Sequence, residues 1–286
     1  MTFSDDLKIM IDNSGASQVG LAAHQLGSEN EILINPDTSF HPASTMKICV
    51  MMEVFHQARD GVFSLDDLIP VKNEFVSLVD QTPYSLSDED DSEKDLYQRI
   101  GQSLSIRDLV LRMITVSSNL ATNILVELVT PEKTTRFMRE LGAESLVVRR
   151  GVEDTLAYRK GLNNASTARG YMEILIKLAN RAVISPVDSD EMIEILAQQQ
   201  FNEMIPSQLP VDVRIAHKTG WTGEYYHDLG IVFPPNSHPF VLVIMTKGFK
   251  EEEKAHPFIG SLAKSIYDHW TNELKKRPSS QRQPHS

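Results

Sequence analysis

A serine and a lysine three residues apart form the first candidate reactive pair of the chain. Ser44 and Lys47 begin an apolar stretch, residues 44–60, whose pattern predicts a buried helix that ends at Gly61. Ser44 would then lie at the helix N-terminus, where unpaired N–H groups favour developing negative charge. Lys47 would share its face, and burial would lower the pKa of the amine. The pair therefore predicts a nucleophilic hydroxyl beside an amine able to take its proton.

A second short motif, Ser117-Ser118-Asn119, interrupts two predicted helices. Side chains at such a break can point into a cleft, so we expect Ser117 to shuttle protons and Asn119 to contact a substrate amide. The alternative is an ordinary turn between helices, in which a Ser or Asn side chain caps the second helix.

A third motif, Lys218-Thr219-Gly220, ends a predicted strand. Lys218 and Thr219 there could hold a carboxylate, and Gly220 would let a substrate approach the backbone. An oxyanion hole needs two backbone N–H donors, for which Ser44 and Trp221 are the natural candidates. The alternative is that Thr-Gly simply forms a turn.

Each motif is weak evidence when taken alone. Ser-x-x-Lys occurs again at Ser261 and Lys264, and Ser-x-Asn occurs again at Ser28 and Asn30. Ser44 could be only a helix cap, and Lys47 only a lysine that extends to the surface. The order of the three first copies, and their places at a helix start, a helix break and a strand end, favour a catalytic site.

In this order the three motifs resemble those of class A β-lactamases and penicillin-binding proteins, and the resemblance covers nearly the whole chain. It implies a serine hydrolase that is acylated at Ser44 by a small-molecule β-lactam or an acyl-D-Ala-type amide. Lys47, Ser117, Asn119, Lys218, Thr219, Gly220 and Trp221 would take the roles described above.

The chain departs from the family pattern in three places. Fast penicillin hydrolases of the family carry Glu-x-x-x-Asn in an Ω-loop, and residues 149–157 lack that pattern. Glu153 is the nearest substitute for the base that activates the deacylating water, although a salt bridge of Glu153 or Asp154 with a neighbouring arginine is the simpler expectation. Ser118 replaces an Asp, and Trp221 replaces a small residue. Acylation is therefore better supported than turnover.

The elements that must position these residues follow from periodicity and from Gly and Pro breaks. We predict an α/β fold of the α+β sandwich type, in which a mostly antiparallel five-stranded sheet from both termini is flanked by helices. An α/β domain would comprise residues 1–40 and 210–286, with an inserted all-helical domain at 41–209 and a disordered tail at 275–286. The expected helices span 2–13, 44–60, 109–116, 120–129, 135–141, 166–182, 189–199 and 252–274, and the expected strands span 18–26, 31–34, 213–219, 230–233 and 240–246.

Composition narrows the function further. The net charge of −11 argues against nucleic acid or an anionic membrane as the main partner, and no apolar run is long enough to span a bilayer. The single cysteine, Cys49, has no disulfide partner in the chain. The acidic run 88–93 is expected to be a solvated surface insertion. Scattered histidines give no metal-ligand spacing, so no metal or cofactor is expected.

Several alternatives stay open at this stage. The same machinery would serve a D-Ala-type peptidase or penicillin-binding protein with slow deacylation, or an esterase. A covalent β-lactam or peptidoglycan sensor would acylate and stay acylated. We expect a monomer. The sequence as written lacks an export signal and predicts a cytoplasmic protein, whereas a trimmed leader would imply a periplasmic or secreted one.

Overall fold

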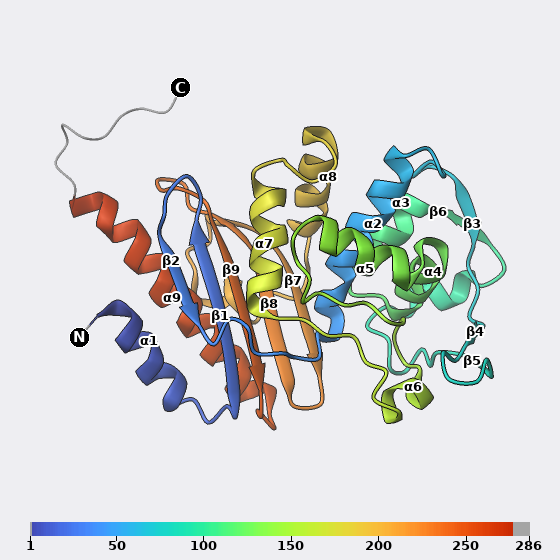
Figure 1. The fold of residues 1–286 in the computed structure, drawn as a ribbon, viewed down its shortest axis with the longest axis horizontal. Helices are drawn as coiled ribbons and strands as arrows, with labels where there is room; N and C mark the ends of the chain where they lie inside the picture. The colour runs from blue at the N-terminus through green and yellow to red at the C-terminus, as the bar shows by residue number, and fades with distance from the viewer. Residues whose placement is uncertain (1, 277–286) are drawn as a thin grey trace.

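The structure is a computed structural model that describes residues 2–276, with side chains through residue 272. Its centre is a five-stranded antiparallel sheet in the order β2-β1-β9-β8-β7 (Figure 1). The strands are β1 (Gln18–Gln25), β2 (Glu31–Ile34), β7 (Arg214–Thr222), β8 (Tyr225–Phe233) and β9 (Phe240–Lys247). Strands from both ends of the chain therefore share one sheet, as the resemblance implies.

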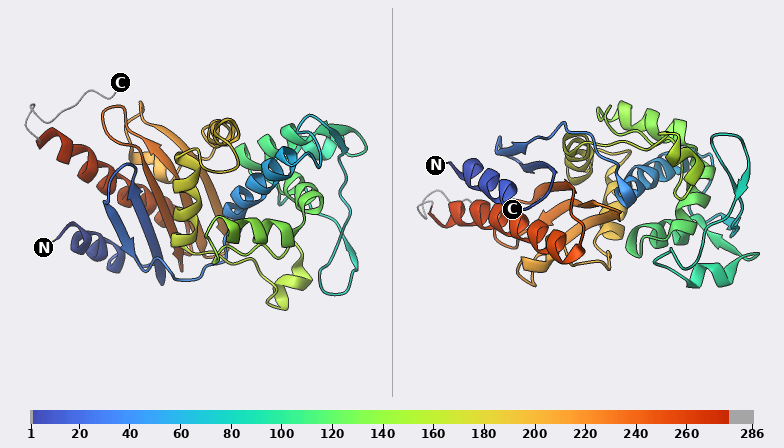
Figure 2. Two further views of the ribbon diagram at one scale, coloured as in Figure 1. Left: turned by 45° about the horizontal axis from the view of Figure 1, so that its top comes forward. Right: turned by 90° about the horizontal axis from the view of Figure 1, so that it is seen from below.

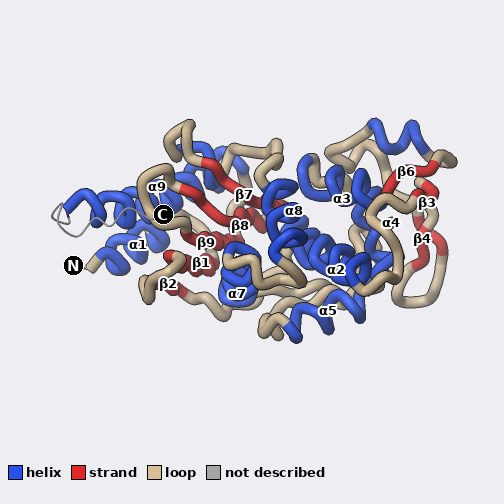
Figure 3. Tube along the Cα trace, turned by 90° about the horizontal axis from the view of Figure 1, so that it is seen from above, coloured by secondary structure: helices blue, strands red, loops and turns tan. Residues whose placement is uncertain are grey.

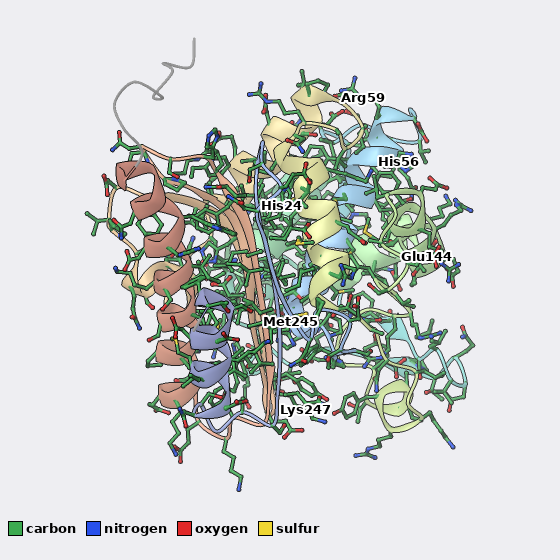
Figure 4. All side chains as sticks on the ribbon, turned by 60° about the vertical axis from the view of Figure 1, so that its left-hand side comes forward. His24, His56, Arg59, Glu144, Met245 and Lys247 are labelled. Carbon is green, nitrogen blue, oxygen red and sulfur yellow. The ribbon has the colours of Figure 1, made fainter. Side chains whose placement is uncertain are left out.

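Helices cover both faces of this sheet. Two terminal helices, α1 (Phe3–Asp12) and α9 (Glu252–Lys276), lie together on one face, and α7 (Ala168–Ala179) lies on the other (Figures 1 and 2). Alternating side chains of the strands feed two separate cores. Met245 of β9, labelled in Figure 4, is fully buried in the core on the α7 side, whereas Ile244 belongs to the core under α9.

The segment between β2 and β7 forms a mostly helical region beside the sheet (Figure 3). Its long apolar helix, α2, packs against several other helices and explains the near-complete burial of residues 47–55. The helices are α2 (Lys47–Arg59), α3 (Ile106–Thr115), α4 (Asn119–Val129), α5 (Pro131–Glu140), α6 (Thr155–Arg159) and α8 (Pro186–Leu196), with 3₁₀ turns η1 (Ala43–Met46), η2 (Asp95–Arg99) and η3 (Ile205–Gln208).

The expected layout is confirmed, with corrections. The inserted region is not all-helical, because β3 (Leu68–Pro70) pairs with β6 (Ser103–Ser105) and β4 (Phe75–Val76) pairs with β5 (Pro83–Tyr84). Strand β8 begins five residues before the expected start, and α6 was not anticipated. Helix α9 reaches Lys276, two residues into the expected disordered tail, and the rest of that tail lies outside the described residues. The domain boundaries stay predictions.

None of the helices in the described part of the chain is both long enough and apolar enough to traverse a bilayer.

Candidate active site

The predicted nucleophile lies in a tight turn rather than at an α-helix N-terminus. Ser44 belongs to the 3₁₀ turn η1, and α2 begins only at Lys47. Ala43 has φ +48°, a backbone conformation that costs an L-residue about 1–2 kcal/mol. Its N–H donates to His41 Nδ1 at 3.0 Å, which helps hold the turn. Ser44 therefore lies near the start of the helical stretch 43–59, as expected, but in a 3₁₀ turn that precedes α2.

The third motif lies directly against this turn. A Cβ atom added to Gly220 would lie 2.9 Å from the backbone nitrogens of both Ser44 and Thr45. Only a glycine allows β7 to approach the turn so closely, so Gly220 has a packing role here, and its predicted role toward a substrate stays a prediction. The next residue, Trp221, has a 67% exposed side chain at the end of the strand.

Lys47 is fully buried and hydrogen-bonded by all three of its possible protons. Its Nζ donates to the Ser117 carbonyl oxygen (2.6 Å), to Ser117 Oγ (3.1 Å) and to Asn119 Oδ1 (2.9 Å). Burial lowers the pKa of Lys47 to about 7, against the opposing charges of Asp91 and Glu153. The expected desolvation is confirmed. The expected direct contact with the nucleophile is not present: within residues 2–276, Ser44 Oγ makes no hydrogen bond.

The Ser117 hydroxyl lies between two buried lysines. Lys218 Nζ donates to Ser117 Oγ at 3.0 Å and to the Thr219 carbonyl oxygen at 2.9 Å. Burial lowers the pKa of Lys218 well below its usual value, and the charge of Lys47 lowers it further. Ser117 itself has φ +57°, which turns its carbonyl oxygen and hydroxyl toward Lys47. The second and third motifs thus meet through one hydroxyl.

Asn119 links Lys47 to the loop that follows α5. Its Oδ1 accepts from Lys47, while its Nδ2 donates to Glu153 Oε1 at 2.8 Å. Ser118 instead accepts a hydrogen bond from the Ala121 N–H, so this middle residue caps α4, as the structural alternative for the motif predicts. The Asn119 side chain therefore contacts two candidate catalytic groups at once.

Glu153 points toward the site and not toward an arginine. Burial raises the pKa of its carboxyl, against the hydrogen bond from Asn119. The expected salt bridges are absent from the described residues: the Arg150 guanidinium donates to the carbonyls of Gly151 and Leu162 and to Asn163 Oδ1. These acceptors occupy the guanidinium of Arg150, and within the described residues no ion pair joins the exposed Arg149 to Glu153 or Asp154.

The loop that carries Glu153 is fastened on either side of it. Asn123 accepts the Val152 N–H at 2.7 Å and donates to the Val152 carbonyl at 3.0 Å. A Cβ on Gly151 would lie 2.2 Å from Asn123 Oδ1, so this clamp requires a glycine there. On the other side, Asp154 caps α6 through the Ala157 N–H and accepts from the Ser77 hydroxyl. Asp154 is thus a structural residue.

A pocket of about 280 Å³ opens between this loop, the nucleophile turn and the end of β7. It brings together four of the residues predicted from the sequence. The residues on which the argument rests are Ser44, Asn119, Glu153, Trp221, His41 and Tyr158. Lys47, Ser117 and Lys218 lie fully or almost fully buried, in hydrogen-bonded contact with one another and with Asn119. Thr219 is 4% exposed, and its role toward a carboxylate stays a prediction.

The spare motif copy is engaged elsewhere. Ser261 Oγ donates to the Pro257 carbonyl at 2.7 Å within α9, and Lys264 pairs with Asp268.

The residue that sequence reasoning missed is Asp91, which is buried and accepts the Asn119 N–H at 2.9 Å. Within the described residues, no group of three or more His, Cys, Asp or Glu side chains is arranged to hold a metal ion.

Known proteins of similar sequence are β-lactamases. The chain is 24% identical to the extended-spectrum β-lactamase PER-1 of Pseudomonas aeruginosa over 272 residues, which cover 90% of this chain and 83% of that one. It is also 24% identical to the β-lactamase Toho-1 of Escherichia coli over 263 residues, covering 90% and 85%.

Solved structures share the fold. A β-lactamase from Sphaerobacter thermophilus matches with a TM-score of 0.79 at 21% identity, covering 94% of this chain and 97% of that one. The structure of PBP-A matches with a TM-score of 0.81 at 21% identity, covering 94% and 96%. The class of protein is thus a serine hydrolase of the β-lactamase kind. The family model described as the β-lactamase enzyme family matches residues 2–270, and the chain belongs to this family.

Proposed function

We propose that the protein hydrolyses β-lactam amides through an acyl-enzyme on Ser44. The observation that carries the proposal is the Ser117 hydroxyl held between Lys47 and Lys218 beside a pocket that contains Ser44. This arrangement supplies a nucleophile, a base of near-neutral pKa and a relay for a proton.

In the acylation step, Ser44 Oγ attacks the amide carbonyl carbon and the amide C–N bond breaks. Lys47 takes the serine proton in its neutral form: the amine then donates to only two of its three present acceptors, and its lone pair accepts from Ser44 Oγ, three residues earlier. Lys47 passes a proton to the ring nitrogen through the Ser117 hydroxyl. The N–H groups of Ser44 and Trp221 would stabilise the oxyanion.

In the deacylation step, water attacks the ester carbonyl carbon and the bond to Ser44 Oγ breaks. Glu153 is the carboxylate in the pocket that faces this region, and its bond to Asn119 supports its role as the base. It takes a proton from the water, and a proton returns to Ser44 as the acid leaves.

A penicillin-binding protein or D-Ala-type peptidase with slow deacylation is the second candidate. The absence of the Glu-x-x-x-Asn pattern from residues 149–157 favours it, because an amide that would help to hold the deacylating water is missing. Turnover of nitrocefin by the wild-type protein separates the two. Steady turnover supports a β-lactamase, and an adduct without turnover supports the second candidate or a covalent sensor. Hydrolysis of short acyl esters alone would indicate an esterase.

The nucleophile is tested by labelling with a fluorescent penicillin. Ser44→Ala should abolish labelling, since it removes the attacking oxygen. Ser261→Ala is the matched control, because it alters the second Ser-x-x-Lys copy and should label like the wild type. Labelling of Ser44→Ala would overturn the proposal.

A further inference from the structure

One carboxylate of the acidic run 88–93 is not on the surface. Asp91 is 4% exposed, whereas Asp88 and Asp90 are exposed. Its Oδ2 accepts the backbone N–H groups of Asn119 and Leu120, each at 2.9 Å. The expectation of a solvated insertion is therefore wrong for this residue, because its carboxylate provides the acceptor for two otherwise unpaired N–H groups at the start of α4.

Four further contacts fix the segment around Asp91. The Tyr97 hydroxyl donates to Oδ2 at 3.1 Å, and the Glu93 N–H donates to Oδ1 at 3.0 Å. Ser92 Oγ donates to the Val116 carbonyl at 2.6 Å, next to the second motif. Glu93 also pairs with Arg112 of α3. The segment thus bridges the end of α3 and the start of α4, where a carboxylate also interacts favourably with the helix dipole.

The turn that Asp91 holds presents the catalytic side chains. Ser117 has φ +57°, and the Ser118 hydroxyl accepts the Ala121 N–H rather than those of residues 119 and 120, so these two N–H groups depend on Asp91. Asn119 in turn contacts both Lys47 and Glu153. One residue therefore separates the Asp91 carboxylate from both candidate bases.

We propose that Asp91 is a positioning residue of this site: it fixes the turn that presents Asn119 to Lys47 and Glu153. The proposal rests on the proposed function for its kinetic consequence, but not for its structural one. Through Asp91, the acidic run 88–93 would therefore contribute to catalysis.

The charge of Asp91 adds an electrostatic effect of defined sign. Burial lowers the pKa of Lys47, and the charge of Asp91 opposes that effect by favouring the ammonium. Burial raises the pKa of Glu153, the hydrogen bond from Asn119 lowers it, and the charge of Asp91 raises it. Removing the charge should therefore ease loss of a proton from both. The other titratable groups that face this region are Lys218, Tyr97, Glu93, Arg112, Asp88 and Asp90.

The test compares Asp91→Asn with Asp88→Asn in the full chain. Both variants remove one negative charge from the same segment, but only Asp91 is buried at α4. The ¹³Cε shift of Lys47, assigned with Lys47→Arg, is followed against pH by NMR. The rate of acylation by penicillin is measured in parallel as a function of pH, and the midpoint of its decrease at low pH is determined. We expect Asp91→Asn to move both midpoints to lower pH by about one pH unit and Asp88→Asn to leave them in place.

Unchanged midpoints in a folded Asp91→Asn protein would overturn the proposal. If this variant does not fold, Asp91→Glu provides the test: it keeps the charge, so the Lys47 midpoint should stay near the wild-type value while acylation slows about tenfold through displacement of Asn119. Wild-type acylation by Asp91→Glu would overturn the proposal. If penicillin does not acylate the wild type, the proposed function fails, but the NMR titration of Lys47 still tests the effect of the Asp91 charge. An unchanged Lys47 midpoint in Asp91→Asn would then refute the charge effect independently of the proposed function.

Discussion

The backbone of Gly220 lies against that of Ser44, with room for a hydrogen atom but not for a Cβ at 2.9 Å from the Ser44 nitrogen. The strand that carries Lys218 and the turn that carries the nucleophile are thereby held in contact. This contact brings together two motifs that lie 174–176 residues apart in the chain, and the reactive geometry depends on it.

Gly220→Ala should push β7 away from the nucleophile turn. Overpacking of this kind costs about 1–3 kcal/mol, and we expect penicillin labelling to slow at least about tenfold. Gly223→Ala in the same hairpin is the control, because it adds a Cβ in open space at φ +55°. It should lower stability by about 1 kcal/mol and leave labelling intact. Equal labelling rates in the two variants would contradict the role of the contact.

Acylation should depend on the proton of Lys47. Because the pKa of Lys47 is about 7, its neutral amine becomes the main form as the pH rises through that value. The acylation rate should therefore increase by about tenfold between about pH 6 and pH 8 and then level off. Stopped-flow measurement of the rate with a chromogenic cephalosporin gives the profile. A flat rate across this range would exclude Lys47 as the base.

Glu153→Gln should separate the two halves of the reaction. It keeps an oxygen that can accept from Asn119 but removes the base, so we expect deacylation to slow by about 10²–10⁴-fold while acylation continues. The acyl-enzyme should then accumulate and be visible by intact mass. Glu144→Gln, which alters an exposed carboxylate labelled in Figure 4, should release product like the wild type. Unchanged release by Glu153→Gln would assign the base to another residue.

His41 should support the strained turn before Ser44. Burial lowers the pKa of His41 to about 4, so the ring is neutral near pH 7 and its Nδ1 can accept the Ala43 N–H. His41→Phe removes this acceptor and should cost about 1–3 kcal/mol of stability, with slower labelling. His41→Asn offers a side-chain oxygen at the same distance along the chain and should recover part of both losses. Thermal unfolding and labelling rates that match wild type in His41→Phe would contradict this role.

The predictable parts of this protein are those that depend on the pattern of residue types within one short segment. Alternating β-branched residues and Gly breaks located the strands, and the apolar run after Lys47 correctly indicated that this amine is buried. Ser117 and Lys218 were singled out from type and order, and they meet at 3.0 Å. Residue type and motif order were therefore enough to select residues that the fold brings into contact, and their catalytic roles stay predictions.

The contacts that were missed depend on tertiary position. Asp91 looks like its exposed neighbours, because nothing local shows that its carboxylate faces the start of α4. Glu153 was expected to form a salt bridge because an arginine lies close to it in the sequence. The sequence does not show that backbone carbonyls already occupy the guanidinium of Arg150. The positive φ of Ala43, just before Ser44, could not be predicted either, because the position is not occupied by a glycine.

Time-resolved intact-mass spectrometry with a penicillin tests the central claim most directly. We expect the wild-type mass to rise by that of one penicillin within seconds, with the adduct mapped to Ser44, and then to return to the starting mass as the acid is released. An adduct on another residue, or hydrolysis of the lactam by Ser44→Ala at the wild-type rate, would contradict an acyl-enzyme formed on Ser44.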